Sequence, residues 1–133
     1  DADLAIDVRM LDRFFDNYIS NPQASIVFNA IRDPADRDPL GDDKARATLE
    51  TSYRWLDDWM EEKTWAAGDA FSLADCAAAP ALFYADWTHA ISKEFRRVHA
   101  YRSRLLDRAS FARAVDEARP FRDLFPLGAP DRD

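Results

Sequence analysis

The chain has 133 residues and a formal net charge of −7, and 47% of its residues are hydrophobic and 32% charged. This balance is typical of one soluble globular domain and excludes a fibrous or disordered chain. The acidic balance argues against a nucleic-acid partner, which usually requires a basic patch. The single cysteine excludes an intramolecular disulfide. No basic leader and no run of about 18 apolar residues is present, so we expect a cytoplasmic protein with no membrane partner.

Residues 3–31 are predicted to form a helix with two apolar faces. The first face has apolar side chains three or four positions apart, namely Leu4, Val8, Leu11, Phe15 and Tyr18. The second face carries Ile6, Met10 and Phe14. Pro22 is expected to interrupt this helix, with a kink at residues 20–21. Because one apolar face suffices to join a bundle, the second indicates a further partner, which could be a missing domain, a partner subunit or a ligand.

The remaining segments also have helical patterns. Residues 32–42 have loop composition, and Asp42 or Asp43 is expected to cap a second helix that ends near residue 62. Residues 72–86 are apolar nearly all round, which places this helix in the middle of a bundle, bent at Pro80. Two further helices are expected over about 94–107 and 110–119, before a surface tail from 120 to 133. The predicted fold class is all-α, a bundle of five or six helices.

One local motif is sharp. Ser72 and Asp75 have the spacing of a capping box, in which each side chain accepts a hydrogen bond from the backbone of the other residue. Phe71 before the cap and Cys76 after the first turn can form a hydrophobic staple. Alone, this pattern marks the start of a helix in any fold and carries no function.

The setting of this box resembles the C-terminal domain of bacterial-type glutathione transferases. In residues 65–75 a glycine turn, an aromatic staple and the box occur together, as they do at the start of the central helix of that domain. Residues 9–18 are similar to its first helix. Residues 101–111 are similar to a late segment of it, although Ala109 stands where a proline is usual. The resemblance covers nearly the whole chain and implies that residues 1–133 form one helical domain of the glutathione transferase C-terminal type.

The resemblance also implies an enzyme as the full-length parent, a glutathione S-transferase that acts on hydrophobic electrophiles in detoxification. The parent would carry an N-terminal thioredoxin-like domain that binds glutathione, and it would form a homodimer. No thioredoxin-like segment is present in this chain. We therefore expect that the chain alone contains no catalytic residue, needs no cofactor and is inactive, with glutathione serving as substrate of the parent only.

In the family that the sequence resembles, the first helix lines the hydrophobic site and part of the dimer interface. Phe14 and Tyr18 lie four residues apart, hence on one helix face, and Asn21 follows just before Pro22. These three residues are the candidate co-substrate wall. Arg13 and Asp16 lie beside them and are candidate contacts to glutathione. The alternative is that Phe14 and Tyr18 pack against the missing domain.

Other chemistry-bearing residues favour structural roles. Cys76 lies on the apolar helix, where a buried thiol is inert. His89 and His99 are not at a metal-binding spacing, so no metal site is expected. A second hypothesis for function is a non-catalytic interaction module, because similar domains are appended to translation factors and aminoacyl-tRNA synthetases. A third is an independent helical bundle.

Overall fold

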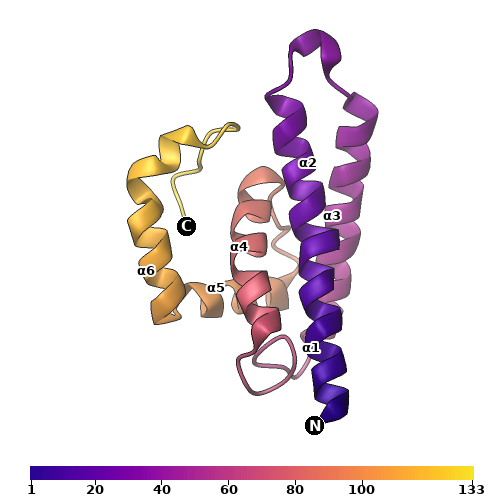
Figure 1. Cartoon of the computed structure of the whole chain (residues 1–133), viewed down its shortest axis with the longest axis vertical. Coiled ribbons are helices and arrows are strands. Elements are labelled where there is room, and N and C mark those ends of the chain that lie inside the picture. The colour runs from indigo at the N-terminus through magenta and orange to yellow at the C-terminus, as the bar shows by residue number, and fades with distance from the viewer.

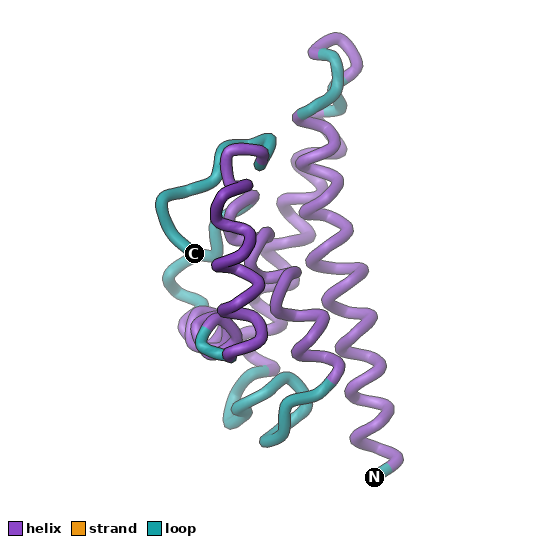
Figure 2. The backbone as a smooth tube through the Cα atoms, turned by 60° about the vertical axis from the view of Figure 1, so that its left-hand side comes forward, coloured by secondary structure: helices purple, strands orange, loops and turns teal.

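The computed structural model describes all 133 residues, and its regular elements are all helical (Figures 1 and 2). The α-helices are α1 (Ala2–Phe14), α2 (Asn21–Ala30), α3 (Pro39–Trp59), α4 (Leu73–Thr88), α5 (Arg96–Leu106) and α6 (Ala109–Ala118). A π-helical segment covers Phe15–Ser20, and 3-10 turns cover Pro34–Asp36 and Arg119–Leu124. The predicted all-α bundle is confirmed. None of the helices combines the length and apolarity that a membrane crossing requires.

The first rod of the bundle runs without a break from α1 through the π-helical segment into α2, beside the antiparallel α3 (Figure 1). Proline lacks an N–H group, and its ring crowds the carbonyl four residues earlier. Here the turn before Pro22 widens instead of breaking, and the Asn21 N–H bonds to the Asp16 carbonyl, five residues earlier. The α-helix is therefore interrupted just before Pro22, as predicted, but by a single π-helical stretch that accommodates the ring, so the rod stays helical throughout.

The tip of the α2–α3 hairpin is closed by side chains. Asp38 caps α3, and its carboxylate accepts a hydrogen bond from the Gly41 N–H at 2.8 Å. The Asn29 amide holds the backbone of Asp38 on both sides, accepting at 2.8 Å and donating at 3.0 Å. The prediction of Asp42 or Asp43 as the cap is wrong by one turn, because Pro39 suits the first helical position and lets the helix begin earlier.

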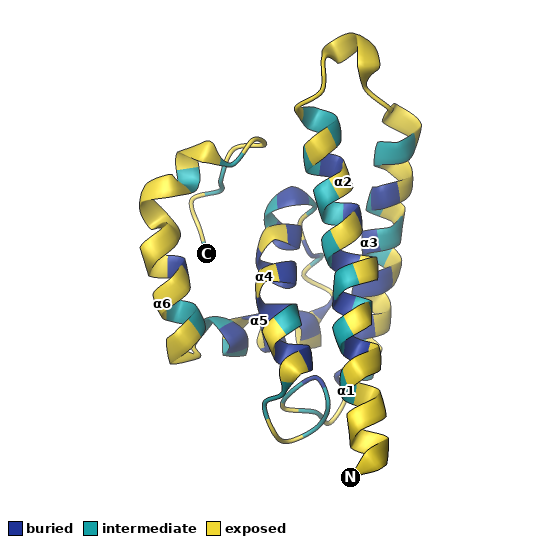
Figure 3. Cartoon of the chain, in the orientation of Figure 1, coloured by how far each residue is buried: buried dark blue, intermediate teal, exposed yellow.

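The core lies where α1, the π-helical segment and α3 meet α4 and α5, and Figure 3 shows buried residues on the inward faces of these elements. Rings and branched side chains fill it. The largest fully buried side chains are Leu11, Phe15, Ile19, Ile26, Leu49, Tyr53, Leu56, Leu82, Val98, Tyr101 and Leu105. Helix α6 contributes only Val115 to the buried residues, so it packs at the edge of the bundle.

Helix α4 is central, as predicted, but it is not buried on every side. Its inner faces contact the first rod and α5. Its third face is bare at Leu73, which is 58% exposed, and at Cys76 and Pro80. The expectation of an all-round buried helix is wrong because α6 and the segment after it cover that face only in part, with Phe125 stacked on Tyr84. The helix remains continuous through Pro80.

Candidate functional site

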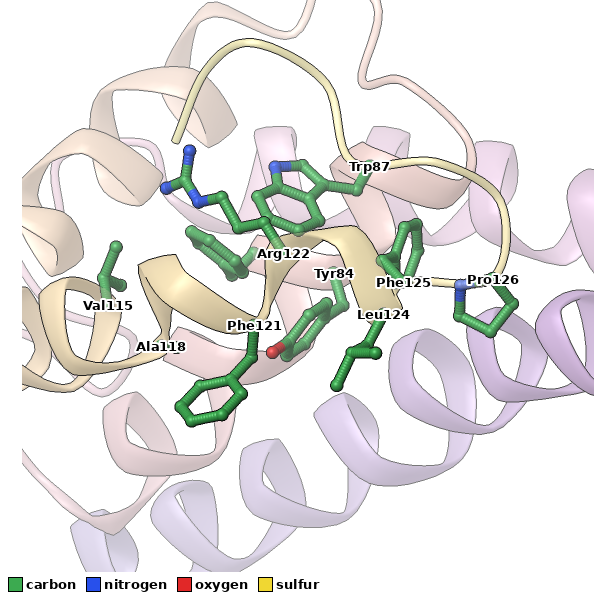
Figure 4. Close-up of a pocket in the computed structure, with 10 residues that line it drawn as sticks. Tyr84, Trp87, Val115, Ala118, Phe121, Arg122, Leu124, Phe125 and Pro126 are labelled. Atoms are coloured by element: carbon green, nitrogen blue, oxygen red, sulfur yellow. The ribbon is translucent and has the colours of Figure 1, made fainter.

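An aromatic pocket of about 250 Å³ lies between α4, α6 and the segment that follows α6 (Figure 4). We call it the tail pocket. Eight of its ten lining residues are hydrophobic, and its wall is Phe83, Tyr84, Trp87, Val115, Ala118, Phe121, Arg122, Leu124, Phe125 and Pro126. Its wall residues come from α4, from α6 and from residues 121–126. The pocket therefore forms only when the tail folds back onto α4.

The rings of the tail pocket pack on one another. Phe125 stacks on Tyr84 with centroids 6.0 Å apart and meets Trp87 edge-on at 5.4 Å. The Arg122 guanidinium lies 5.3 Å from the centre of the Trp87 ring. Such a wall of flat apolar surface with one cation suits an aromatic ligand, because ligand pockets combine apolar lining with a few polar groups.

A second hollow, of about 290 Å³, lies on the first rod. Phe14, Tyr18, Thr51, Ser52 and Trp55 line it, and we call it the rod hollow. Phe14 stacks on Tyr18 at 6.0 Å and contacts the Trp55 ring at 4.5 Å. The hollow is therefore a shallow aromatic surface with two hydroxyl-bearing residues from α3. It shares no lining residue with the tail pocket.

The structure brings together two of the three predicted wall residues. Phe14 is half-buried and Tyr18 is 55% exposed, and both line the rod hollow. Asn21 does not line it. The Asn21 side chain is exposed and lies 3.5 Å from that of Asn17. The expected freeing of Asn21 by a helix break does not occur, because the rod is continuous.

The candidate glutathione contacts are already paired. The Arg13 guanidinium lies 2.7 Å from the Asp12 carboxylate and 2.8 Å from that of Asp16. Hydrogen bonding to Asp12 and the two negative charges raise the pKa of Arg13. A glutathione carboxylate would compete with these aspartates for the arginine, whose side chain is 64% exposed.

Ser72 and Asp75 meet as the sequence indicates, in a reciprocal capping box. The Ser72 hydroxyl accepts from the Ala74 N–H at 3.3 Å, and Asp75 accepts from the Ser72 N–H at 2.8 Å. Asp75 is fully buried and also accepts from the Ala66 N–H at 2.8 Å. This network shapes the start of α4 and faces neither hollow.

The prediction that Cys76 is buried is wrong. The Cys76 thiol is exposed on the bare face of α4. The side chains of Ala74 and Asp75 enter the core, whereas the Cys76 side chain projects from a different side of the helix. Both histidines contact polar groups of this chain. His89 Nε2 lies 2.7 Å from a Glu50 carboxylate oxygen, and His99 Nε2 lies 3.1 Å from the Ile91 carbonyl oxygen.

The tail pocket was not predicted from the sequence. It depends on a long-range contact between α4 and residues 121–126, which were expected to wrap the surface. The signal that could have found it is the cluster of apolar residues in the tail, Phe121, Leu124, Phe125 and Leu127, which is unusual for a solvated segment.

Known proteins resemble this chain in sequence pattern and in fold. Residues 23–109 match the glutathione S-transferase C-terminal domain. No curated protein sequence matches the chain. A glutathione S-transferase domain-containing protein from Marinobacter aquaeolei VT8 has a TM-score of 0.73 at 20% identity, covering 84% of this chain and 57% of its own.

Two further solved structures have the same arrangement of helices. A glutathione S-transferase from Methylobacillus flagellatus KT with GSH bound has a TM-score of 0.71 at 23% identity, over 81% of this chain and 55% of its own. One from Rhodospirillum rubrum F11 has a TM-score of 0.68 at 23% identity, over 84% and 52%. The present chain thus spans about half the length of these structures. Since the sequence match extends over residues 23–109, well over half of the 133 residues, the chain belongs to the glutathione S-transferase family and corresponds to its C-terminal domain.

Proposed function

We propose that residues 1–133 are one domain, the co-substrate-binding helical half of a glutathione transferase that conjugates glutathione to hydrophobic electrophiles. The observation that carries the proposal is the rod hollow, in which Phe14, Tyr18 and Trp55 present aromatic surface that no element of this chain covers. Flat rings with a few hydroxyl groups suit an apolar electrophile that carries a polar substituent.

The proposal assigns different tasks to the two halves of a longer cytoplasmic parent. An N-terminal thioredoxin-like domain would bind glutathione and stabilise its thiolate, and a homodimer would be the working form. In the helical half, Phe14 and Tyr18 would hold the electrophile with a secondary contribution from Asn21, while Arg13 and Asp16 would contact glutathione. No reactive constellation within these 133 residues is required.

Kinetics with glutathione and chlorodinitrobenzene, an aromatic electrophile, test the proposal. The full-length parent should conjugate the two substrates. The 133-residue chain alone should give no conjugation and no heat of glutathione binding in a calorimetric titration. Tight binding of glutathione by the isolated chain, or a parent without transferase activity on any hydrophobic electrophile, would contradict the proposal.

A non-catalytic interaction module is the second candidate, and the bare face of α4 favours it. Leu73, Cys76 and Pro80 form an apolar stripe that a protein partner could cover. The same stripe would also be covered by a neighbouring domain of an enzyme. The sequence that precedes residue 1 in the parent separates the two, since a thioredoxin-like sequence favours the enzyme and a synthetase-like one the module.

A further inference from the structure

Trp55 is the ring that α3 contributes to the rod hollow, whereas Phe14 and Tyr18 belong to the first rod. The Trp55 ring contacts Phe14 with centroids 4.5 Å apart and remains 38% exposed. An indole is a large flat apolar surface, and aromatic pairs gain from ring-on-ring contact beyond the area that they bury. Trp55 is therefore the residue of the hollow best suited to stack on a flat ligand.

The two hydroxyl groups from α3 are turned toward their own helix. The Thr51 hydroxyl donates to the Ala47 carbonyl oxygen at 3.1 Å, and the Ser52 hydroxyl donates to the Thr48 carbonyl oxygen at 2.7 Å. Both hydroxyl protons are thus used within α3. Because the hollow offers a ligand chiefly ring surface, the orientation of its rings decides which shapes fit.

A second tryptophan, one turn further along α3, fixes the orientation of Trp55. The indoles of Trp55 and Trp59 stack with centroids 5.2 Å apart and planes 16° from parallel. Residues four apart on a helix can form such a pair. Trp59 does not line the hollow, so it acts on a ligand there only through Trp55.

Trp59 is in turn attached to the turn that precedes α4. Its Nε1–H donates to the Ala66 carbonyl oxygen at 2.8 Å. The Lys63 ammonium lies 4.7 Å from the centre of the Trp59 ring and donates to the Trp59 carbonyl oxygen at 2.7 Å. Ala66 is fully buried, and its N–H donates to the Asp75 carboxylate at 2.8 Å. A continuous series of contacts therefore runs from the buried start of α4 to the exposed ring of Trp55.

We propose that Trp55 makes the rod hollow selective for flat aromatic electrophiles, and that Trp59 is the positioning residue that holds the Trp55 ring for stacking. The inference rests on the rod hollow being the electrophile wall proposed above. A flat ring system lies on the Trp55 indole, beside Phe14 and Tyr18. A globular apolar ligand touches the same indole at fewer atoms and gains no stacking.

Titration of the 133-residue chain with 1-aminoanthracene, a flat and uncharged fluorescent compound, tests the role of Trp55. Trp55→Leu keeps an apolar side chain but removes the flat ring. It should weaken binding of this dye by about three- to tenfold, the range expected for one aromatic pair. Displacement of the dye by adamantanol, which is apolar and globular, should report an adamantanol affinity that changes by less than about twofold, since no ring stacking is lost.

The matched control for this substitution is Tyr84→Ala in the tail pocket, because Tyr84 is 39% exposed, as Trp55 is 38% exposed. It should leave the affinity for aminoanthracene unchanged. No saturable binding of the dye by the unmutated chain, equal losses for the dye and adamantanol in Trp55→Leu, or an equal loss of dye binding in Tyr84→Ala would overturn the inference.

Two substitutions of Trp59 test its positioning role. Both remove the hydrogen bond to Ala66, but Trp59→Phe keeps a ring against Trp55 and Trp59→Leu does not. Trp59→Leu should therefore weaken aminoanthracene binding nearly as much as Trp55→Leu does, whereas Trp59→Phe should recover most of the affinity. Equal losses in the two Trp59 variants would show that Trp59 does not act on a ligand through the Trp55 ring.

Nuclear magnetic resonance of the unmutated chain gives an answer even where a variant fails to fold. The chain has four tryptophans, Trp55, Trp59, Trp65 and Trp87, and each gives one indole N–H signal. Added aminoanthracene should shift the Trp55 signal most and leave that of Trp87, in the tail pocket, unchanged. A Trp55 signal that does not move, or a larger shift at Trp87, would overturn the inference.

Kinetics of the full-length parent separate this inference from the proposed function. Trp55→Leu should raise KM for chlorodinitrobenzene by about three- to tenfold, the factor expected from one lost aromatic pair. KM for 1-iodohexane, a non-aromatic electrophile, and kcat for both should stay nearly unchanged. An equal rise in KM for both electrophiles would overturn the selectivity alone. A parent without transferase activity would contradict the proposed function, and the dye titrations would still decide whether Trp55 selects flat ligands.

Discussion

The Tyr101 hydroxyl donates a 2.7 Å hydrogen bond to Oδ1 of Asp75, and both side chains are fully buried. The same carboxylate oxygen accepts from the Ala66 N–H at 2.8 Å, while Oδ2 accepts from the Ser72 N–H at 2.8 Å. One aspartate therefore joins α5, the turn before α4 and the first turn of α4. Asp75 therefore holds separate segments of the fold together, in addition to capping α4.

Asp75→Ala should destabilise the chain by about 2–4 kcal/mol, because it leaves several buried donors without an acceptor. Ser72→Ala should cost only about 1 kcal/mol, the usual loss for a helix cap. Urea unfolding monitored by circular dichroism measures both free energies. Equal effects of the two substitutions would mean that Asp75 acts as a cap alone.

A double-mutant cycle separates the two parts of the network. Tyr101→Phe removes only the hydroxyl and should cost about 1 kcal/mol, the net contribution of one hydrogen bond. Combined with Asp75→Ala, it should cost less than the sum, because the two substitutions remove one shared bond. Additive free energies would show that the Tyr101–Asp75 bond is not formed in solution.

Alkaline pH should weaken the fold through two tyrosines. Burial, followed by the nearby carboxylates, raises the pKa of Tyr53 and of Tyr101 in the folded chain. A raised pKa in the folded state means that the stabilisation is complete below the unfolded tyrosine pKa of about 10 and is lost as pH rises above it. Phenolate absorbance of Tyr53 and Tyr101 should therefore appear together with unfolding.

The matched variant for this pH dependence is Tyr101→Phe, which has one fewer titrating group. Its free energy of unfolding should fall less steeply with pH above about 10 than that of the parent chain, because fewer protons are released on unfolding. Identical slopes would show that Tyr101 ionises without loss of structure.

Local patterns in the sequence predicted the helices and the capping box well, because these depend on residues within one or two turns. The start of α4 required only Ser72, Asp75 and their neighbours. The predicted start of α5, near residue 94, lies slightly before the observed start at Arg96, because its first N–H groups are capped from a distant helix. Asp57 of α3 accepts from the Arg97 N–H at 2.9 Å and from the Val98 N–H at 3.1 Å. No local spacing reveals such a contact.

The candidate site was predicted only in part for the same reason. Phe14 and Tyr18 share a helix face, so their pairing could be inferred, but the Trp55 ring that completes the rod hollow comes from another helix. The tail pocket depends on Phe125 reaching back to Tyr84, a contact between residues far apart in sequence. Because α4 is apolar nearly all round, its composition does not indicate which face is exposed. Cys76 was therefore wrongly predicted to be buried.

The exposed Cys76 thiol should react with a maleimide in the folded chain, without denaturant, to a stoichiometry of one. Mass spectrometry after brief labelling measures this directly. Cys76→Ser should change the free energy of unfolding by less than about 0.5 kcal/mol, as is usual for a surface substitution. Labelling that occurs only in urea would place the thiol in the interior.

Tyr18→Ala in the full-length parent should lower kcat/KM for an aromatic electrophile by about five- to tenfold, equivalent to about 1–1.4 kcal/mol of transition-state binding. Glutathione affinity should stay nearly unchanged. Because Tyr18 is 55% exposed, its truncation leaves the core intact. Asn21→Ala is the matched control outside the rod hollow and should have a smaller effect. If Tyr18→Ala unfolds the parent, or if glutathione binding falls in parallel with turnover, then Tyr18 packs against a neighbouring domain and the assignment of the wall is wrong.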